Sequence, residues 1–175
     1  HLIVFTSRAS NLISNDTNNV NDVFIHNLWT GETRRISVSS SGEQGDRYSA
    51  GGDISANGRY VAFSSEAQNL APGYEIWKHV YVHDLETGET TRVSVWPDGY
   101  PMVGWAEAPT ISGDGRYVAF EFDDRGDGMP VRWIYVRDRV TGQMIAATKG
   151  DSEGQGSPFN PSFSTDGHFL AFDSG

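Results

Sequence analysis

Cysteine is absent from the 175-residue chain, and positively charged residues are few, with 13 Lys and Arg against 23 Asp and Glu. Without cysteine the chain has no disulfide scaffold, thiolate zinc site or cysteine nucleophile. A formal net charge of -10 argues against nucleic acid as a partner, because phosphate binding needs clustered Lys and Arg. No run of about 18 apolar residues is present, so we expect no membrane insertion. No basic-then-apolar leader opens the chain, so we expect no export signal within it.

Glycine and aromatic residues, in contrast, are plentiful: the chain has 20 Gly, and 12% of its residues are aromatic, with five Trp. Many turns together with many aromatic side chains predict an all-β repeat protein. A five-residue block that ends in phenylalanine recurs, and these phenylalanines are 58, 57 and 52 positions apart. The four copies of this block are 1–5, 59–63, 116–120 and 168–172.

Three further blocks keep the same order along the chain. They lie at 23–28, 80–85 and 134–139; at 35–38, 92–95 and 144–147; and at 53–55, 109–112 and 161–164. Each block is a short run rich in β-branched or aromatic residues, which predicts a strand. Asn-Gly or Asp-Gly pairs lie between the first two strands of a repeat, where a tight hairpin needs residues that tolerate positive φ. No segment has a convincing 3.6-residue period, so we predict no helix.

Four antiparallel strands repeated every 52–58 residues are typical of a β-propeller blade. The repeat runs Ser-x-Asp-Gly-Arg-Tyr-Val-Ala-Phe and, after a loop, Val-Tyr-Val-x-Asp-Leu-x-Thr-Gly-x-Thr-x-Arg-Val-Ser. Over nearly the whole chain this order resembles the TolB-type, WD40-like propeller repeat of bacterial envelope and secreted proteins. The resemblance implies a periplasmic or extracellular location in a bacterium. It leaves the function open, since the same blade occurs in scaffolds, peptidases and lyases.

The blocks divide the chain into partial and whole blades. We expect a blade without its first strand (1–51), two whole blades (52–107 and 108–159) and a half blade (160–175). Fewer than four blades do not close into a ring, which allows two interpretations. Either the chain is part of a longer propeller, or copies of it assemble. A symmetric homodimer of three-blade chains would complete a six-bladed ring.

Alternating strand direction puts the short connections of each blade on one face and the long connections on the other. We call these the tight-turn face (55–59, 85–89 and their equivalents) and the long-loop face (6–22, 64–79, 121–133 and the connections between blades). Between 13 and 17 residues separate the second and third strands of each blade. Binding residues are usually found on long loops held by a rigid scaffold, so we place any site on the long-loop face.

Aromatic residues gather in or beside these long loops. They are Tyr74, Trp77, Trp96, Tyr100, Trp105 and Trp133. Exposed Trp and Tyr anchor sugars, peptides and protein partners, because they offer a large contact area with a polar group. The alternative is that individual rings fill the wedge between neighbouring blades. Two Trp flanking one Tyr within ten residues favour at least one exposed ring.

The first long loop also contains a candidate metal site. Asp16, Asn18 and Asp22 have the one-three-seven oxygen spacing that calcium loops use. The loop lacks the sixth-position Gly and the terminal Glu of an EF-hand, and the other repeats do not keep the pattern. The alternative is a polar loop whose side chains make local turn bonds. Calcium is the only cofactor that the sequence suggests.

Catalytic motifs are missing from the sequence. It has no Gly-x-Ser-x-Gly elbow and no histidine pair at metal-ligand spacing, so we predict no catalytic residue. The leading hypothesis is a non-catalytic binding or assembly module whose long loops contact a protein or a carbohydrate. One alternative, which rests on the resemblance, is a segment of a propeller-containing enzyme of the peptidase or polysaccharide lyase type. The other is a calcium-stabilised structural module.

Overall fold

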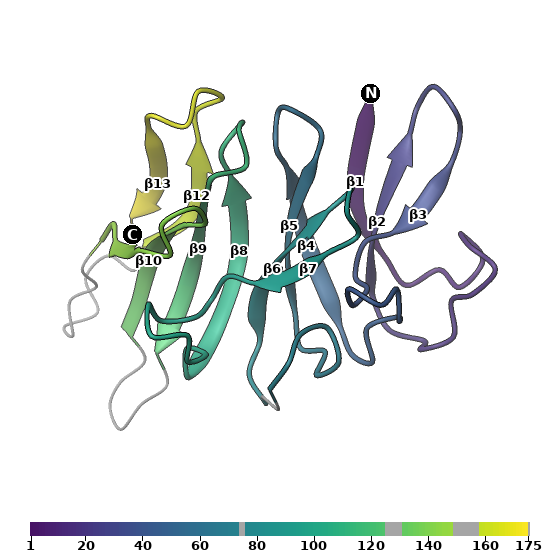
Figure 1. The fold of residues 1–175 in the computed structure, drawn as a ribbon, viewed down its shortest axis with the longest axis horizontal. Helices are drawn as coiled ribbons and strands as arrows, with labels where there is room; N and C mark the ends of the chain where they lie inside the picture. Colours follow the sequence, from purple (N-terminus) through teal and green to yellow (C-terminus); the bar gives the residue numbers. More distant parts are fainter. Residues whose placement is uncertain (74–75, 125–130, 149–157, 175) are drawn as a thin grey trace.

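The computed structural model describes residues 1–73, 76–124, 131–148 and 158–174. The strands of this part of the chain form four antiparallel sheets that lie side by side in chain order (Figure 1). The first sheet contains β1 (Leu2–Ser7), β2 (Asp22–Asn27) and β3 (Thr33–Arg35). The second contains β4 (Ser49–Ile54), β5 (Tyr60–Ser65), β6 (His79–Asp84) and β7 (Thr90–Arg92). The third contains β8 (Gly104–Ile111), β9 (Tyr117–Asp124), β10 (Val131–Asp138) and β11 (Met144–Ala146), and the fourth β12 (Pro158–Phe163) and β13 (Leu170–Ser174).

The prediction of all-β propeller blades is confirmed. Each four-stranded sheet is a meander in which sequential strands pair, and the described residues form an open array in which no sheet closes on itself. These residues include no helix long and apolar enough to cross a membrane. Figure 1 shows the β4–β5, β8–β9 and β12–β13 turns at the upper edge of the array and the long β5–β6 connection at the lower edge.

Turn chemistry explains why Asn-Gly and Asp-Gly recur. In the β8–β9 turn the Ser112 hydroxyl donates to Asp114 Oδ1 at 2.6 Å, and the same oxygen accepts the backbone N–H of Arg116 at 2.9 Å. Gly115 has a φ of 77°, a left-handed conformation that glycine adopts without steric cost. The turns at Asn57 and Asp166 repeat these bonds. The turn residues therefore fix each hairpin locally.

A second repeated device ties the start of one strand to the end of its neighbour. Arg116 binds Asp138 through two nitrogens, with its Nη2 at 2.7 Å from Oδ2, and Arg59 binds Asp84 in the same way. The hydrogen bond from Arg116 holds the pKa of Asp138 well below its usual range. These Arg and Asp residues recur at the same positions of the repeat blocks, and their ion pairs stabilise the blade.

The core lies between successive sheets. One buried cluster joins the first and second sheets through residues such as Val23, Ile25 and Phe63, and another joins the second and third through residues such as Val82 and Phe120. Fully burying an aliphatic or phenylalanine side chain contributes about 1.5–3 kcal/mol, so these layers hold the blades together. The loops that carry candidate site residues are thus anchored on a packed scaffold.

Candidate functional site

The structure describes five of the six aromatic residues that the sequence singled out, and Tyr74 lies outside the described residues. Tyr100 is the most exposed of the five, with 71% of its surface accessible. Trp77, Trp96, Trp105 and Trp133 are half-buried. The predicted aromatic residues therefore divide into an exposed anchor and rings that share their surface with the scaffold.

A tight turn displays Tyr100. Val95 and Pro101 form an isolated antiparallel bridge, and between them Trp96 N–H donates to the Tyr100 carbonyl at 2.8 Å. The Tyr100 N–H donates to Asp98 Oδ1 at 3.1 Å. Because these bonds already hold the backbone, binding through the Tyr100 side chain would lose little loop entropy. The turn therefore holds the Tyr100 ring in a preorganised, exposed position.

Trp77 and Trp105 lie on two segments that a backbone bond joins. Ala106 N–H donates to the Lys78 carbonyl at 2.9 Å, linking the end of the β5–β6 loop to β8 of the next blade. The Lys78 ammonium lies 5.3 Å from the centre of the Trp105 ring and 3.0 Å from Glu107 Oε2. The cation–π contact and the ion pair together fix the orientation of the Trp105 ring.

Two exposed aliphatic residues on these segments were not predicted. Ile76 is 65% exposed and Val103 is 61% exposed. We call these two residues, together with Trp77, Tyr100 and Trp105 of the same long-loop face, the loop patch. Exposed apolar side chains that gather on one face mark interaction surfaces. Their position beside Trp residues in otherwise polar loops was the available sequence signal.

The other two predicted Trp residues pack on one tyrosine. The Trp96 ring packs edge-on against the Tyr135 ring, with 5.7 Å between the ring centres and 90° between the ring planes. The centre of the Trp133 ring lies 6.1 Å from the centre of the Tyr135 ring. The Phe122 ring also packs edge-on against Tyr135, with 5.9 Å between the ring centres. Aromatic pairs of this kind add about 0.5–1.5 kcal/mol beyond area burial. We therefore expect Trp96 and Trp133 to contribute mainly to stability.

The structure brings Asp16, Asn18 and Asp22 together, and it places a cation among them. Arg35 Nη2 lies 3.2 Å from Asp16 Oδ1, and Arg35 Nε lies 3.2 Å from Asp22 Oδ2. Asn18 and Gln44 donate to Asp22 Oδ2 at 3.1 and 2.9 Å. Calcium would compete with Arg35 for the same oxygens, and calcium binding here stays a prediction. Among the described residues no three His, Asp or Glu side chains are grouped to hold a metal ion.

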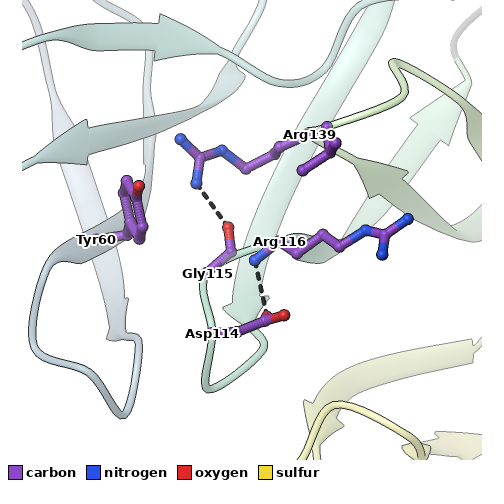
Figure 2. Close-up of a pocket in the computed structure, with 6 residues that line it drawn as sticks. Tyr60, Asp114, Gly115, Arg116 and Arg139 are labelled. Atoms are coloured by element: carbon purple, nitrogen blue, oxygen red, sulfur yellow. Dashed lines mark hydrogen bonds between the residues drawn. The ribbon is translucent and has the colours of Figure 1, made fainter.

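A cavity of about 390 Å³ opens on the tight-turn face, where we expected no site. It is lined by Tyr60, Asp114, Gly115, Arg116, Arg139 and Val140 (Figure 2). The Arg139 guanidinium lies 4.4 Å from the centre of the Tyr60 ring and donates to the Gly115 carbonyl at 2.6 Å. Burial lowers the pKa of Arg139. Arg139 thereby bridges the second and third blades, which gives this cavity a structural role.

The sequence offered one signal for this cavity. Arg139 takes the position that Leu28 and Leu85 hold in the other copies of its block. A change from an apolar to a cationic residue at a repeat position marks a place where one blade junction differs from the next. Figure 2 shows the Arg139 side chain directed toward Tyr60 across this junction, while the Arg116 guanidinium points away from it.

Comparison with known proteins shows a fold-level relationship. No protein-family profile matches the sequence, and no curated protein matches it. Among solved structures the chain is similar to the tricorn protease, with 20% identity and a TM-score of 0.61 over 90% of this chain and 13% of that one. It is similar to TolB from Agrobacterium tumefaciens, with 16% identity and a TM-score of 0.59 over 91% of this chain and 52% of that one.

A third similar structure is oligogalacturonate lyase from Vibrio parahaemolyticus, with 15% identity and a TM-score of 0.57. That match covers 90% of this chain and 40% of the lyase. The chain thus has the TolB-like propeller fold, and it spans between 13% and about half of the length of these three structures. At such identities the likeness shows the fold alone, and the fold is shared by enzymes and by TolB.

Proposed function

We propose that the chain is a non-catalytic binding module, a propeller scaffold that presents the loop patch to a protein partner. The observation that carries the proposal is the hydrogen-bonded turn that holds Tyr100 outward with 71% of its surface exposed. Tyrosine and tryptophan are enriched among the residues that dominate binding energy at protein interfaces. The long-loop face carries this exposed tyrosine and two half-buried Trp rings, those of Trp77 and Trp105.

The aliphatic residues of the loop patch favour a protein over a carbohydrate. Ile76 and Val103 are branched aliphatic residues that are more than half exposed, and their apolar surface suits the desolvated centre of a protein interface. A carbohydrate is the second candidate, because the half-buried rings of Trp77 and Trp105 offer flat faces. The TolB-like fold supports a periplasmic or extracellular setting for such a module.

Assembly with a second copy is a further part of the proposal. The β12–β13 sheet has only two strands among the described residues; Phe172 of β13 is 42% exposed, and Phe169, which directly precedes β13, is 73% exposed. Exposed phenylalanines on and beside an edge strand favour burial against another sheet. A homodimer that completes a six-bladed ring would provide that sheet.

The binding proposal is tested with a matched pair of variants. Tyr100→Ala removes the exposed anchor on the long-loop face, and Val140→Ala removes an apolar side chain that is 76% exposed on the tight-turn face. Partners are isolated on immobilised wild-type chain from an extract of the source organism, and the affinity of the purified partner is then measured by calorimetry. We expect Tyr100→Ala to weaken binding by about tenfold or more and Val140→Ala to leave it unchanged. Equal affinity for wild type and Tyr100→Ala would refute the assignment of the site.

An enzyme segment is the alternative function. It is supported by the similarity of this fold to the tricorn protease and to oligogalacturonate lyase. A turnover assay of the purified chain with peptide and oligogalacturonate substrates separates the two functions. Turnover that survives Tyr100→Ala would overturn the binding-module proposal in favour of the enzyme.

A further inference from the structure

The first blade shows how the scaffold neutralises a buried arginine. Arg35 lies 3.2 Å from Asp16 and 3.2 Å from Asp22, and its Cζ lies 5.9 Å from the centre of the Phe24 ring. Asp22 also accepts a hydrogen bond from Ser37 at 2.6 Å. The positive charge in this blade is therefore compensated by two carboxylates of the chain itself.

The second blade repeats the arginine. Arg92 faces Tyr81 across β6 and β7, as Arg35 faces Phe24 across β2 and β3. The Arg92 Cζ lies 5.8 Å from the centre of the Tyr81 ring, against 5.9 Å in the first blade. The two guanidinium groups thus occupy equivalent places in their blades.

A histidine takes the place of Asp22, one of the two carboxylates that pair with Arg35. His79, like Asp22, is the residue that opens the third strand of its blade, and its Nδ1 lies 3.0 Å from Ser94 Oγ. Its side chain is buried, and desolvation together with the charge of Arg92 lowers the pKa of His79 to about 3. A neutral imidazole therefore stands where the first blade has a negative charge.

The other carboxylate, that of Asp16, also has no counterpart in the described part of the second blade. Asp16 and Gly73 each lie seven residues before the buried valine of the third strand. A Cβ added to Gly73 would lie 3.7 Å from Arg92 Nη1, so the missing side chain leaves its space beside the guanidinium. Pro101 takes the bridge position of Gln44, which in the first blade donates to Asp16.

A cavity of about 560 Å³ occupies this position, lined by Arg92, Gly73, Gly99 and Pro101 among others. The buried Nε atoms of Arg35 and Arg92 both lack a hydrogen-bond partner, but Arg35 has two ion pairs, whereas in the described part of the chain Arg92 forms none, although Glu89 lines the same cavity. Arg92 is half-buried, and a partly desolvated guanidinium without a counter-charge favours a ligand that supplies a negative charge.

We propose that Arg92 binds a carboxylate of an acidic peptide segment in this cavity, in the place that Asp16 occupies beside Arg35. The inference rests on the proposed binding function and deepens it, because Tyr100 lies between the two cavity residues Gly99 and Pro101. The partner would then carry an Asp or Glu side chain next to the surface that covers Tyr100. A guanidinium and a carboxylate form the charge-assisted hydrogen bonds that make such a contact specific.

The test uses the whole chain and a blocked diglutamate peptide, with the blocked diglutamine peptide as its neutral match. Binding is followed by NMR through the backbone amide shifts of Gly73 and Gly99. We expect the diglutamate peptide to bind wild type, and Arg92→Gln to weaken this binding by about tenfold or more. Arg34→Gln removes the same charge from an exposed arginine of the first blade and should change nothing. Equal binding by Arg92→Gln, or equal binding of the diglutamine peptide, would overturn the proposal.

A second variant restores the carboxylate within the chain. His79→Asp recreates the Asp22 arrangement beside Arg92, so it should abolish peptide binding while Arg92 stays in place, and unchanged binding would contradict the proposal. Glu75, outside the described residues, is the acid closest in sequence to Gly73. If the diglutamate peptide bound the Glu75→Gln variant but not wild type, the proposal would also be contradicted, because the cavity of wild type would then hold the chain's own carboxylate.

Three further measurements separate the possible failures. Peptide binding that persists in Tyr100→Ala supports the Arg92 site independently of the loop patch. Preference for glucuronate over the diglutamate peptide would overturn the assignment to a peptide. A partner that needs Tyr100 but binds Arg92→Gln with full affinity would overturn this inference and leave the proposed function intact.

Discussion

Trp96 and Tyr100 lie four residues apart in one turn, and the structure places their side chains in different environments. Trp96 is half-buried and packs edge-on against Tyr135, whereas Tyr100 is 71% exposed. Replacing each by Ala leaves the backbone bonds of the turn available, because those bonds involve main-chain atoms of both residues. The pair therefore isolates the side-chain contributions within a single local structure.

The expected loss of stability differs severalfold between the two variants. Trp→Ala in a core costs about 3–5 kcal/mol, so a half-buried ring that also loses an aromatic pair should cost about 2–4 kcal/mol. For a chain of this length each kcal/mol lowers Tm by roughly 2–4 °C, which gives a decrease of roughly 5–15 °C for Trp96→Ala. Tyr100→Ala should change the free energy of unfolding by less than about 0.5 kcal/mol.

Thermal unfolding followed by circular dichroism, with urea unfolding for the free energies, measures both variants. Trp96→Phe serves as the control, since it keeps an aromatic ring against Tyr135 and should recover much of the loss. Comparable destabilisation by Tyr100→Ala and Trp96→Ala would refute the division of these residues into anchor and core. A stable Trp96→Ala chain would refute it too.

Three other predictions concern the scaffold. Burial lowers the pKa of His79 from 6.5 to about 3, so the unfolded chain binds a proton that the folded chain excludes, and stability should fall as pH decreases from about 6.5 toward 3; a smaller fall for His79→Gln in pH-dependent urea unfolding checks this. Because Arg35 already pairs with Asp16 and Asp22, calcium should leave Tm equal to its value in chelator, and a clear rise with calcium would favour the calcium-stabilised module. Light scattering should give a mass near twice 19.2 kDa if copies complete a ring, and a monomer at high concentration would contradict ring closure by dimerisation.

The blades could be predicted because their signals are local. The Phe-ending block places β5, β9 and β13, and the Asn-Gly and Asp-Gly pairs place the hairpins before them. Each turn fixes its own geometry through a side chain and a glycine, so no distant contact is needed to recognise it. Because these short signals recur in the same order, together they predict the propeller fold.

The candidate site was harder to predict from the sequence, because the exposure of its side chains depends on contacts between blades. Trp96 and Trp105 both follow from the sequence as loop-side aromatic residues, yet Trp96 packs on Tyr135 of β10 and Trp105 lies beside Lys78. These partners are 39 and 27 residues away in the sequence. Single-sequence periodicity indicates which side of a strand a residue occupies, and it says nothing about which ring in a loop finds a partner.

The charge arrangement around Arg35 also depended on the structure. The spacing of Asp16, Asn18 and Asp22 was interpreted as a cation loop, and the cation that the structure places there is a guanidinium from β3. Only the three-dimensional equivalence of positions between blades shows that Arg92 lacks the same carboxylates. Repeats thus provide an internal reference for finding functional differences.

The most direct test of the binding-module account is site-specific photo-crosslinking. A photoreactive benzoyl-phenylalanine is placed at Tyr100 on the long-loop face or at Val140 on the tight-turn face, two positions that are 71% and 76% exposed. Each labelled chain is irradiated with the purified partner, and adducts are identified by mass spectrometry. The account predicts an adduct from position 100 and none from position 140. An adduct from position 140 alone would contradict it.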